Sequence, residues 1–242
     1  MVFLERLSDA EKANKYIHGI IKGSSVKEDG KSSTLTAPNG TAQQLVIKTA
    51  LKEGNVRPEQ IEYVEAHGTG TPLGDPIETN SIVATYGKKR KTDLYLGAVK
   101  SNIGHLETAA GVAGIIKTCL VMQKGVIPPV CHYKKLNPQI ELNDKTHVVD
   151  KVTEWNTKEK YAGVSSFGFS GIISHVVLKS YDNGNRKAVD SVVTWNHERC
   201  IHPNLLKKET QPANFGILAF ESRFPGMYVE MSELEKYDDS EG

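Results

Sequence analysis

Apolar positions recur with two different periods along this chain, and the changes of period mark its predicted elements. Short apolar runs between glycine, proline or polar clusters predict strands at residues 2–7, 16–24, 61–66, 94–99, 162–166 and 173–180. Longer stretches with apolar residues three and four apart predict helices at 41–53, 76–86 and 107–124, and irregular chain follows until the last two strands. Alternating strands and helices indicate a sheet covered by helices, so the predicted class is α/β.

The predicted helix at 107–124 begins with a run of small residues. Residues 108–114 are alanine, glycine, threonine and a single valine. Each glycine in an exposed helix costs about 1 kcal/mol relative to alanine, so Gly111 and Gly114 indicate that a neighbouring backbone packs very close to this helix. Gly125 is expected to end the helix, and Pro128-Pro129 bars its continuation.

One histidine stands between a predicted strand and a predicted helix. His67 follows the strand at 61–66, and a loop rich in glycine and threonine comes next. Asp75, Pro76 and Glu78 fit the N-cap, first and third positions of the following helix. A side chain at the carboxyl end of a strand, beside a helix N-terminus, lies where open α/β sheets bind ligands. His67 is therefore a candidate functional residue.

A second histidine has a similar setting downstream. The strand at 94–99 is followed by Lys100, and His105 lies just before the helix with the small residues. His105 is the second candidate, with Lys100 as a charged neighbour.

At these two loops the chain resembles the β-ketoacyl synthases, the condensing enzymes of fatty-acid and polyketide synthesis. Residues 67–78 match the family's motif around its first histidine, and residues 100–111 match the motif around its second. Residues 35–44 look like the segment before the first histidine in modular polyketide synthases, and residues 164–171 look like the glycine-rich loop near the family's carboxyl end. The four motifs keep the family's order and spacing, and the resemblance covers residues 2–180.

The resemblance implies a thiolase-like fold, which consists of two similar βαβαβ halves whose central helices pack together. The chain is then the C-terminal half, with helices covering a mixed sheet, preceded by the last strand of the first half at 2–7. Its start is expected to be a truncation. In such a half the small-residue face is expected to be exposed, so that the chain self-associates or aggregates. This face comprises Ala109, Ala110, Ala113 and Gly114.

The family's reaction explains a need for two histidines. The condensing enzyme decarboxylates a malonyl-type extender on the phosphopantetheine arm of an acyl carrier protein, and the resulting enolate attacks an acyl thioester. N–H donors aimed at the extender's thioester oxygen stabilise the charge that develops there. The resemblance implies that His67 and His105 are these donors, with Lys100 as the cation that helps to keep them neutral. It also implies that substrate and pantetheine contact Thr69, Thr71, Phe167, Gly168 and Phe169.

The family's nucleophile has no counterpart in this sequence. The acyl-accepting cysteine of the family precedes the first histidine, and no cysteine precedes His67 here. Cys119, Cys131 and Cys200 lack the helix N-terminus or cationic neighbour that makes a thiolate. We therefore expect the isolated chain to be inactive without the missing N-terminal half.

The loop near the carboxyl end also departs from the family. Ser170 replaces a glycine, and residues 172–174 replace a segment with threonine and asparagine, which removes hydrogen-bonding side chains near the acyl pocket. Both changes weaken the expectation of full activity. His175 matches a histidine of the family's late strand, and both a structural and a catalytic role are open for it.

Composition narrows the possible partners. The formal net charge of +1 gives no reason to expect nucleic acid or an anionic membrane, and the basic run at 88–91 is interpreted as a solvated connection. The sequence has no stretch of transmembrane length and no signal peptide. Three widely separated cysteines fit a reduced, cytoplasmic protein. No metal is expected, because neither candidate histidine has a partner at metal-ligand spacing.

The predicted organisation is a ketosynthase half at 1–181, a polar linker at 182–214 and a short tail at 215–242. The tail is either the start of a further domain or disordered. Expected partners are an acyl carrier protein, the missing half and other synthase domains, with a homodimer when complete. Two other functions stay open: a non-catalytic module that binds a carrier protein or partner subunit, and a metal hydrolase that uses His67 and His105.

Overall fold

A mixed sheet organises the part of the chain that the structure, a computed structural model, describes: residues 2–30, 38–87 and 90–186. The helices are α1 (Leu7–Lys12), α2 (Gly40–Glu53), α3 (Gly74–Tyr86), α4 (Lys100–Ile103) and α5 (Ala110–Lys124), with short 3-10 turns η1 (Pro58–Gln60) and η2 (Glu107–Ala109). The strands are β1 (Ile20–Glu28), β2 (Tyr63–Glu65), β3 (Leu94–Gly97), β4 (Val126–Ile127), β5 (Thr146–Val148), β6 (Thr153–Glu154), β7 (Tyr161–Phe167) and β8 (Ile172–Lys179). The predicted α/β class is confirmed.

The order of the six strands in the main sheet is β1-β8-β7-β2-β3-β5. β1 and β7 are antiparallel to β8, whereas β7, β2, β3 and β5 are parallel to one another. Glu65 at the end of β2 lies opposite Gly97 on one side and Val164 on the other. The chain therefore leaves β2, β3 and β7 at the same edge of the sheet, which brings three distant loops together.

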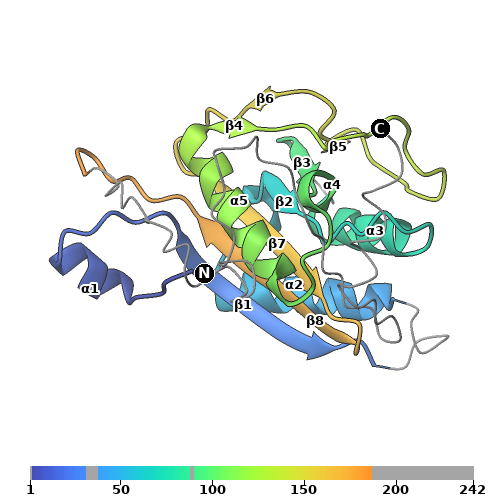
Figure 1. Ribbon diagram of the computed structural model, residues 1–242, viewed down its shortest axis with the longest axis horizontal. Helices are drawn as coiled ribbons and strands as arrows, with labels where there is room; N and C mark the ends of the chain where they lie inside the picture. The colour runs from blue at the N-terminus through green and yellow to red at the C-terminus, as the bar shows by residue number, and fades with distance from the viewer. Residues whose placement is uncertain (1, 31–37, 88–89, 187–242) are drawn as a thin grey trace, which may run out of the picture. The chain divides into compact units, whose positions relative to one another are not determined.

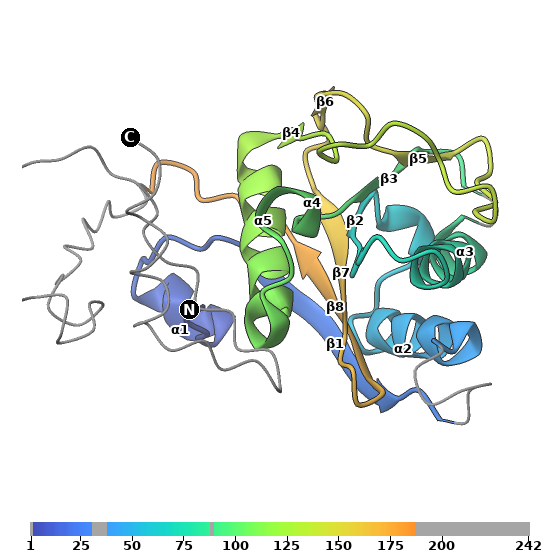
Figure 2. The ribbon, with the colours of Figure 1, turned by 45° about the vertical axis from the view of Figure 1, so that its right-hand side comes forward.

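Helices cover both faces of this sheet, as Figures 1 and 2 show. On one face α2 and α3 pack side by side, and the core there contains Val46, Ile47, Ile82 and Tyr86. On the other face α5 packs along β7, and the core there contains Tyr63, Val121, Met122 and Trp155. Because helices lie on both faces of the sheet, its central strands are buried on both sides, as is usual for parallel strands.

Gly111 and Gly114 of α5 face the sheet. A Cβ on Gly114 would lie 3.2 Å from Val164 Cγ1, and one on Gly111 would lie 3.0 Å from Ser166 Oγ. The glycines do allow a close approach, but the nearest atoms belong to side chains of the sheet and not to a neighbouring backbone as predicted. Gly125, with φ of 64°, ends the helix as predicted. The prediction that this face is exposed is wrong for Ala110 and Gly114, which are buried, whereas Ala109 is exposed and Ala113 is half-buried.

Different side chains form the exposed face of α5. Val112, Ile116 and Leu120 follow one another at intervals of four residues and are 37%, 41% and 49% exposed. We call this set the α5 apolar stripe.

The predicted strand at residues 2–7 is wrong. Residues 2–6 form no strand, and α1 begins at Leu7. Phe3 and Leu4 are 87% and 68% exposed, so this apolar run has no sheet to join within the described residues.

The predicted strand at 16–24 begins later, at Ile20, because its register is fixed by pairing with β8: Ile20 lies opposite Lys179 and Glu28 opposite Ile172.

The segment after α5, predicted to be irregular, contains three short strands. β5 adds an edge to the main sheet by pairing with β3, and β4 pairs with β6 in a small separate ribbon. Strands of two or three residues are too short to show a period in the sequence. The predicted linker and tail lie outside the described residues, apart from residues 182–186.

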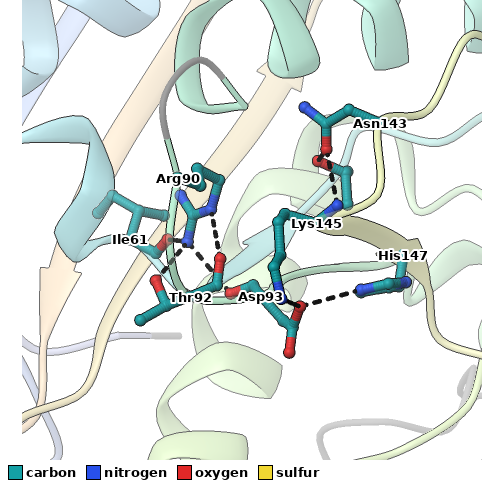
Figure 3. A network of polar contacts seen from close by, with 8 residues as sticks. Ile61, Arg90, Thr92, Asp93, Asn143, Lys145 and His147 are labelled. Atoms are coloured by element: carbon teal, nitrogen blue, oxygen red, sulfur yellow. Dashed lines mark hydrogen bonds and ion pairs between the residues drawn. The ribbon is translucent and has the colours of Figure 1, made fainter.

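The basic run at 88–91 contains a buried arginine, which corrects its interpretation as a wholly solvated connection. Arg90 is 8% exposed. Its guanidinium donates to the carbonyl oxygens of Ile61 at 2.6 Å, Thr92 at 3.0 Å and Asp93 at 3.1 Å (Figure 3). Five donors in a planar fork suit several carbonyls at once, so Arg90 links the end of α3 to the starts of β2 and β3. Lys91 beside it is exposed.

Candidate active site

A cavity of about 510 Å³ lies where the loops after β2, β3 and β7 meet. Seven of the predicted site residues line it: His67, His105, Thr69, Thr71, Phe167, Gly168 and Phe169. Lys100 does not line the cavity and instead contacts His67. Glu78 also lines it, and Asp29, Pro38, Gln43, Gly171 and Ile173 complete the wall on the side of β1, α2 and β8.

His67 is held so that one ring nitrogen is fixed as an acceptor. The side chain is buried, and its Nδ1 lies 3.3 Å from the backbone N–H of Phe167 and 3.4 Å from Lys100 Nζ. Because both of these groups are donors, the proton of a neutral ring belongs on Nε2. Lys100 Nζ also donates to the carbonyl oxygen of His67 at 2.6 Å.

The surroundings of His67 keep it neutral at pH 7. Burial, and next the positive charge of Lys100 and the proximity of His105, lower the pKa of His67 to about 4. Burial also lowers the pKa of Lys100, opposed by the carboxylates of Glu78 and Glu65.

His105 is oriented by the backbone of its own loop. Its Nδ1 accepts the N–H of Glu107 at 2.9 Å, which places the proton of the neutral ring on Nε2. Glu107 has a positive φ of 49°, and this turn aims its N–H back at the ring. The rings of His67 and His105 lie 5.4 Å apart at 79° to each other. Two Nε2–H donors on one cavity can stabilise one developing negative charge.

Glu78 supports the loop that carries His67. Its buried carboxylate accepts the N–H of His67 at 2.6 Å and of Gly68 at 2.9 Å. Burial raises the pKa of Glu78 to about 7, although these hydrogen bonds oppose the shift. The sequence indicates Glu78 only as part of a helix start. The predicted N-cap, Asp75, lies inside the first turn of α3 instead, where it accepts the N–H of Gly70 at 3.0 Å.

Glu65 supports the loop that carries Lys100, and sequence reasoning missed it. Its Oε1 accepts the N–H of Val99 at 2.5 Å, directly before Lys100. Its Oε2 pairs with Lys117 of α5 at 2.9 Å and accepts the Tyr63 hydroxyl at 2.5 Å. The sequence does hold a signal for this role, because Glu65 is a charged residue within an apolar strand. A carboxylate buried there needs hydrogen-bond donors or a cation as partners.

The two threonines and the late loop form the rim of the cavity. Thr69 Oγ1 lies 3.4 Å from Thr71 Oγ1, which accepts the N–H of Gly74 at 3.0 Å. Both threonines are exposed. The Phe167 ring lies 5.1 Å from the ring of His67, whereas Phe169 is 93% exposed.

His175 occupies the core and does not line the cavity. Its Nε2 lies 2.7 Å from the Tyr86 hydroxyl and its Nδ1 3.0 Å from Ser165 Oγ. Burial lowers the pKa of His175 to about 3. The sequence leaves a structural and a catalytic role open for His175, and these buried hydrogen bonds fit the structural role.

Neither described cysteine lines the cavity. Cys119 lies on α5, where burial raises the pKa of its thiol, and Cys131 accepts the side-chain N–H of Asn102 at 2.8 Å. Cys200 lies outside the described residues. Within residues 2–30, 38–87 and 90–186, no three histidine, cysteine, aspartate or glutamate side chains are grouped to hold a metal ion. No helix in this part of the chain is long and apolar enough to cross a membrane.

Known families match most of the described chain. Residues 18–134 match the family described as β-ketoacyl synthase, C-terminal domain, and residues 137–203 match the ketoacyl-synthetase C-terminal extension. The polyketide synthase GfsA of Streptomyces halstedii is 41% identical over 96% of this chain and 4% of its own length. The erythronolide synthase EryA3 of Saccharopolyspora erythraea is 46% identical over 74% of this chain and 6% of its own length.

Solved ketosynthases share the fold. The ketosynthase from module 6 of the bacillaene synthase of Bacillus subtilis 168 superposes with a TM-score of 0.70 at 38% identity, covering 74% of this chain and 33% of that chain. The chain thus belongs to the β-ketoacyl synthases and has their thiolase-like fold. Within that family, it carries the C-terminal domain of a ketosynthase of the modular polyketide synthase type. It spans about a third of the ketosynthase chain it matches and less than a tenth of each of these two synthases.

Proposed function

We propose that this chain supplies the half of a condensing site that acts on the extender unit in a decarboxylative Claisen condensation. The observation that carries the proposal is the pair of imidazoles 5.4 Å apart on one cavity, each with Nδ1 occupied by a donor. Nε2–H of His67 and of His105 would donate to the thioester oxygen of a malonyl-type extender. As carbon dioxide leaves, the electron pair of the broken C–C bond forms the enolate, and its negative charge develops on that oxygen.

Neutral imidazoles suit this role better than imidazolium ions. A neutral ring donates a hydrogen bond and does not transfer its proton to the enolate, which must keep its electron pair to attack the acyl thioester. The position of Lys100 supports this proposal, because a cation 3.4 Å from Nδ1 of His67 opposes protonation of the ring. Lys100 would therefore act on the reaction through His67.

The extender reaches such a site on a long arm. In the proposed function this arm is the phosphopantetheine of an acyl carrier protein. Thr69 and Thr71 are exposed hydroxyls at the rim of the cavity and would bond the amides of the arm, and residues 167–169 would contact the substrate. The other proposed partners are an N-terminal ketosynthase half, further synthase domains and a second copy of the complete ketosynthase. The proposed location is the cytoplasm.

In this proposal the acyl-accepting cysteine comes from an N-terminal ketosynthase half. No cysteine precedes His67 in the sequence, and neither Cys119 nor Cys131 lines the cavity. We infer that the chain alone does not condense substrates. The same observation supports a second candidate function, a non-catalytic module that binds a carrier protein or partner subunit.

Complementation with a ketosynthase first half that carries the cysteine tests the main proposal. His67→Ala and His105→Ala are each expected to abolish condensation but to leave acylation of the cysteine largely intact, because the donors act only on the developing enolate. Labelling with an acyl donor in a single turnover, followed by malonyl-carrier protein, separates the two steps.

The exposed His132 provides the matched control, and His132→Ala should leave both steps unchanged. Condensation that survives both substitutions at His67 and His105 would contradict the assignment of these histidines. A complex that assembles and acylates but never condenses, even with the unsubstituted chain, would favour the binding module.

A further inference from the structure

Two buried oxygen atoms on the β1–α2 side of the cavity have no hydrogen-bond partner in the described part of the chain. They are Oδ1 of Asp29 and Oε1 of Gln43. Both residues line the same cavity as the two histidines. Buried polar atoms in folded proteins are nearly always paired, so two unpaired acceptors in residues of one cavity wall point to a donor from outside the described residues.

Asp29 is fixed in place by its neighbours. Its Oδ2 accepts the backbone N–H of Asn39 at 3.0 Å, and its backbone carbonyl accepts the Asn39 side-chain N–H at 2.9 Å. Its own N–H donates to the carbonyl of Gly171 at 2.7 Å. One carboxylate oxygen is therefore used to join β1 to the start of α2, and the other is left without a donor.

Gln43 is held by the helix that follows. It lies in the first turn of α2, where its N–H donates to the Asn39 carbonyl at 3.0 Å. The residue is 2% exposed, and its position is fixed by α2, which packs on β1, β8 and α3. The backbone of Gln43 is therefore held in place by a rigid element.

We propose that Asp29 and Gln43 form a hydrogen-bond-accepting subsite that takes a hydroxyl or amide N–H of the thioester substrate. The proposal rests on the proposed function, because it assumes that the cavity holds an acyl or extender thioester. Both unpaired atoms are acceptors, so the matching ligand group is a donor. A ligand without the donor would leave the two buried acceptors unpaired, so the site should reject such a ligand strongly. An apolar wall, by contrast, rejects a ligand with an added hydroxyl only weakly.

Two parts of such a substrate carry donors: a hydroxyl on the acyl chain and the amide N–H groups of the pantetheine arm. Calorimetric titration of the 242-residue chain distinguishes them. The probes are stable acyl-pantetheine thioethers with a hydroxyl at the β, δ or ζ carbon, the same chains without the hydroxyl, and the unhydroxylated chains on an N-methylated pantetheine. We expect one donor to strengthen binding about tenfold, and the probe pair that shows the difference identifies its source.

Variants test whether this preference comes from the subsite. Gln43→Leu and Asp29→Asn should each reduce the tenfold preference to a small factor. Gln44→Leu, one residue along the same helix and outside the cavity lining, should keep it. The comparison of probes on the unsubstituted chain needs no variant, so it remains decisive if Gln43→Leu does not fold.

The outcomes are separable from those of the proposed function. If every probe binds with the same affinity, or if the preference survives Gln43→Leu, the subsite is overturned and the extender site is not. An equal loss for all probes in Gln43→Leu also overturns it and assigns Gln43 to an internal hydrogen bond with Asp29 through a rotated amide. If no probe binds, the subsite is overturned, whereas the proposed function is decided separately by the complementation experiment.

Discussion

At the residue scale, the two histidines reach the same tautomer by different means. Nδ1 of His67 is fixed by groups far away in the sequence, Lys100 and the backbone of Phe167, whereas Nδ1 of His105 is fixed by Glu107 two residues on. The motifs in the sequence predicted both histidines and Lys100 as site residues. They did not indicate which nitrogen carries the proton, because for His67 that depends on loops brought together by the pairing of β2 with β3 and β7.

Replacement of Lys100 tests its effect on His67. Burial is the larger cause of the low pKa and the Lys100 charge the next, so Lys100→Met should raise the pKa of His67 from about 4 part of the way towards 6.5. Stability that the neutral ring contributes is lost as pH falls from 6.5 through the folded pKa, so in the variant the loss should still begin near pH 6.5 but should be smaller and complete at a higher pH. NMR titration of ring-labelled histidines measures the shift. Lys100→Arg keeps the charge and serves as control; an equal shift in both variants would contradict a charge effect.

Glu78 gives a pH dependence of the opposite sign. Its pKa is raised from 4.5 to about 7, so the folded state favours the protonated carboxyl, and that stability is present below pH 4.5 and lost as pH rises to about 7. Glu78→Gln does not titrate. The free energy of unfolding of this variant should therefore gain on the unsubstituted chain by about 3 kcal/mol between these pH values.

Urea unfolding at a series of pH values checks this prediction. Glu53→Gln, at an exposed position of α2, is the matched control and should show no such trend. If the difference in the free energy of unfolding between Glu78→Gln and the unsubstituted chain does not change with pH, the raised pKa of Glu78 is refuted.

At the scale of elements, long periodic segments were predictable and short ones were not. α2, α3 and α5 follow the apolar period of the sequence because each buries one face on the sheet. β5 shows no such period, and it is a strand only because β3 offers it an edge. The buried Arg90 was missed for a related reason. Its guanidinium is buried because it donates to the carbonyl oxygens of Ile61 and Asp93, just before β2 and β3, and a run of basic residues in the sequence does not reveal these partners.

Arg90 should make a large contribution to stability. Arg90→Met removes the donor from the buried carbonyl of Ile61 and from the part-buried carbonyls of Thr92 and Asp93, so we expect a loss of about 3 kcal/mol in the free energy of unfolding. Lys91→Met, the exposed neighbour, should change it by about 0.5 kcal/mol or less. Urea unfolding of the two variants compares them directly, and similar values would mean that the guanidinium hydrogen bonds add nothing.

At the scale of the molecule, the resemblance to a known family determined more than the local patterns did. It gave the thiolase-like fold and the edge of the sheet where the cavity lies. It misled at 2–7, because an apolar run of the right length was taken for the family's strand, and on α5, because Ala110 and Gly114 were expected to be exposed but are buried. Gly114 packs on the sheet, and the exposed side of the helix is the larger and more apolar set, Val112, Ile116 and Leu120.

The α5 apolar stripe should make this chain self-associate. Three large apolar side chains in line on one helix present a continuous surface that a second copy of the same helix can cover, and burying them removes apolar area from water at about 25 cal/mol per Å². The double variant Ile116→Gln/Leu120→Gln should shift the chain towards the monomer in sedimentation equilibrium and leave its melting temperature nearly unchanged, since both side chains are 41–49% exposed in the single chain. Lys48→Gln, an exposed change on α2 and away from the stripe, is the control and should not alter the association constant. If the unsubstituted chain is a monomer at every concentration measured, or if the double variant associates as strongly as the original, the stripe is not the contact surface.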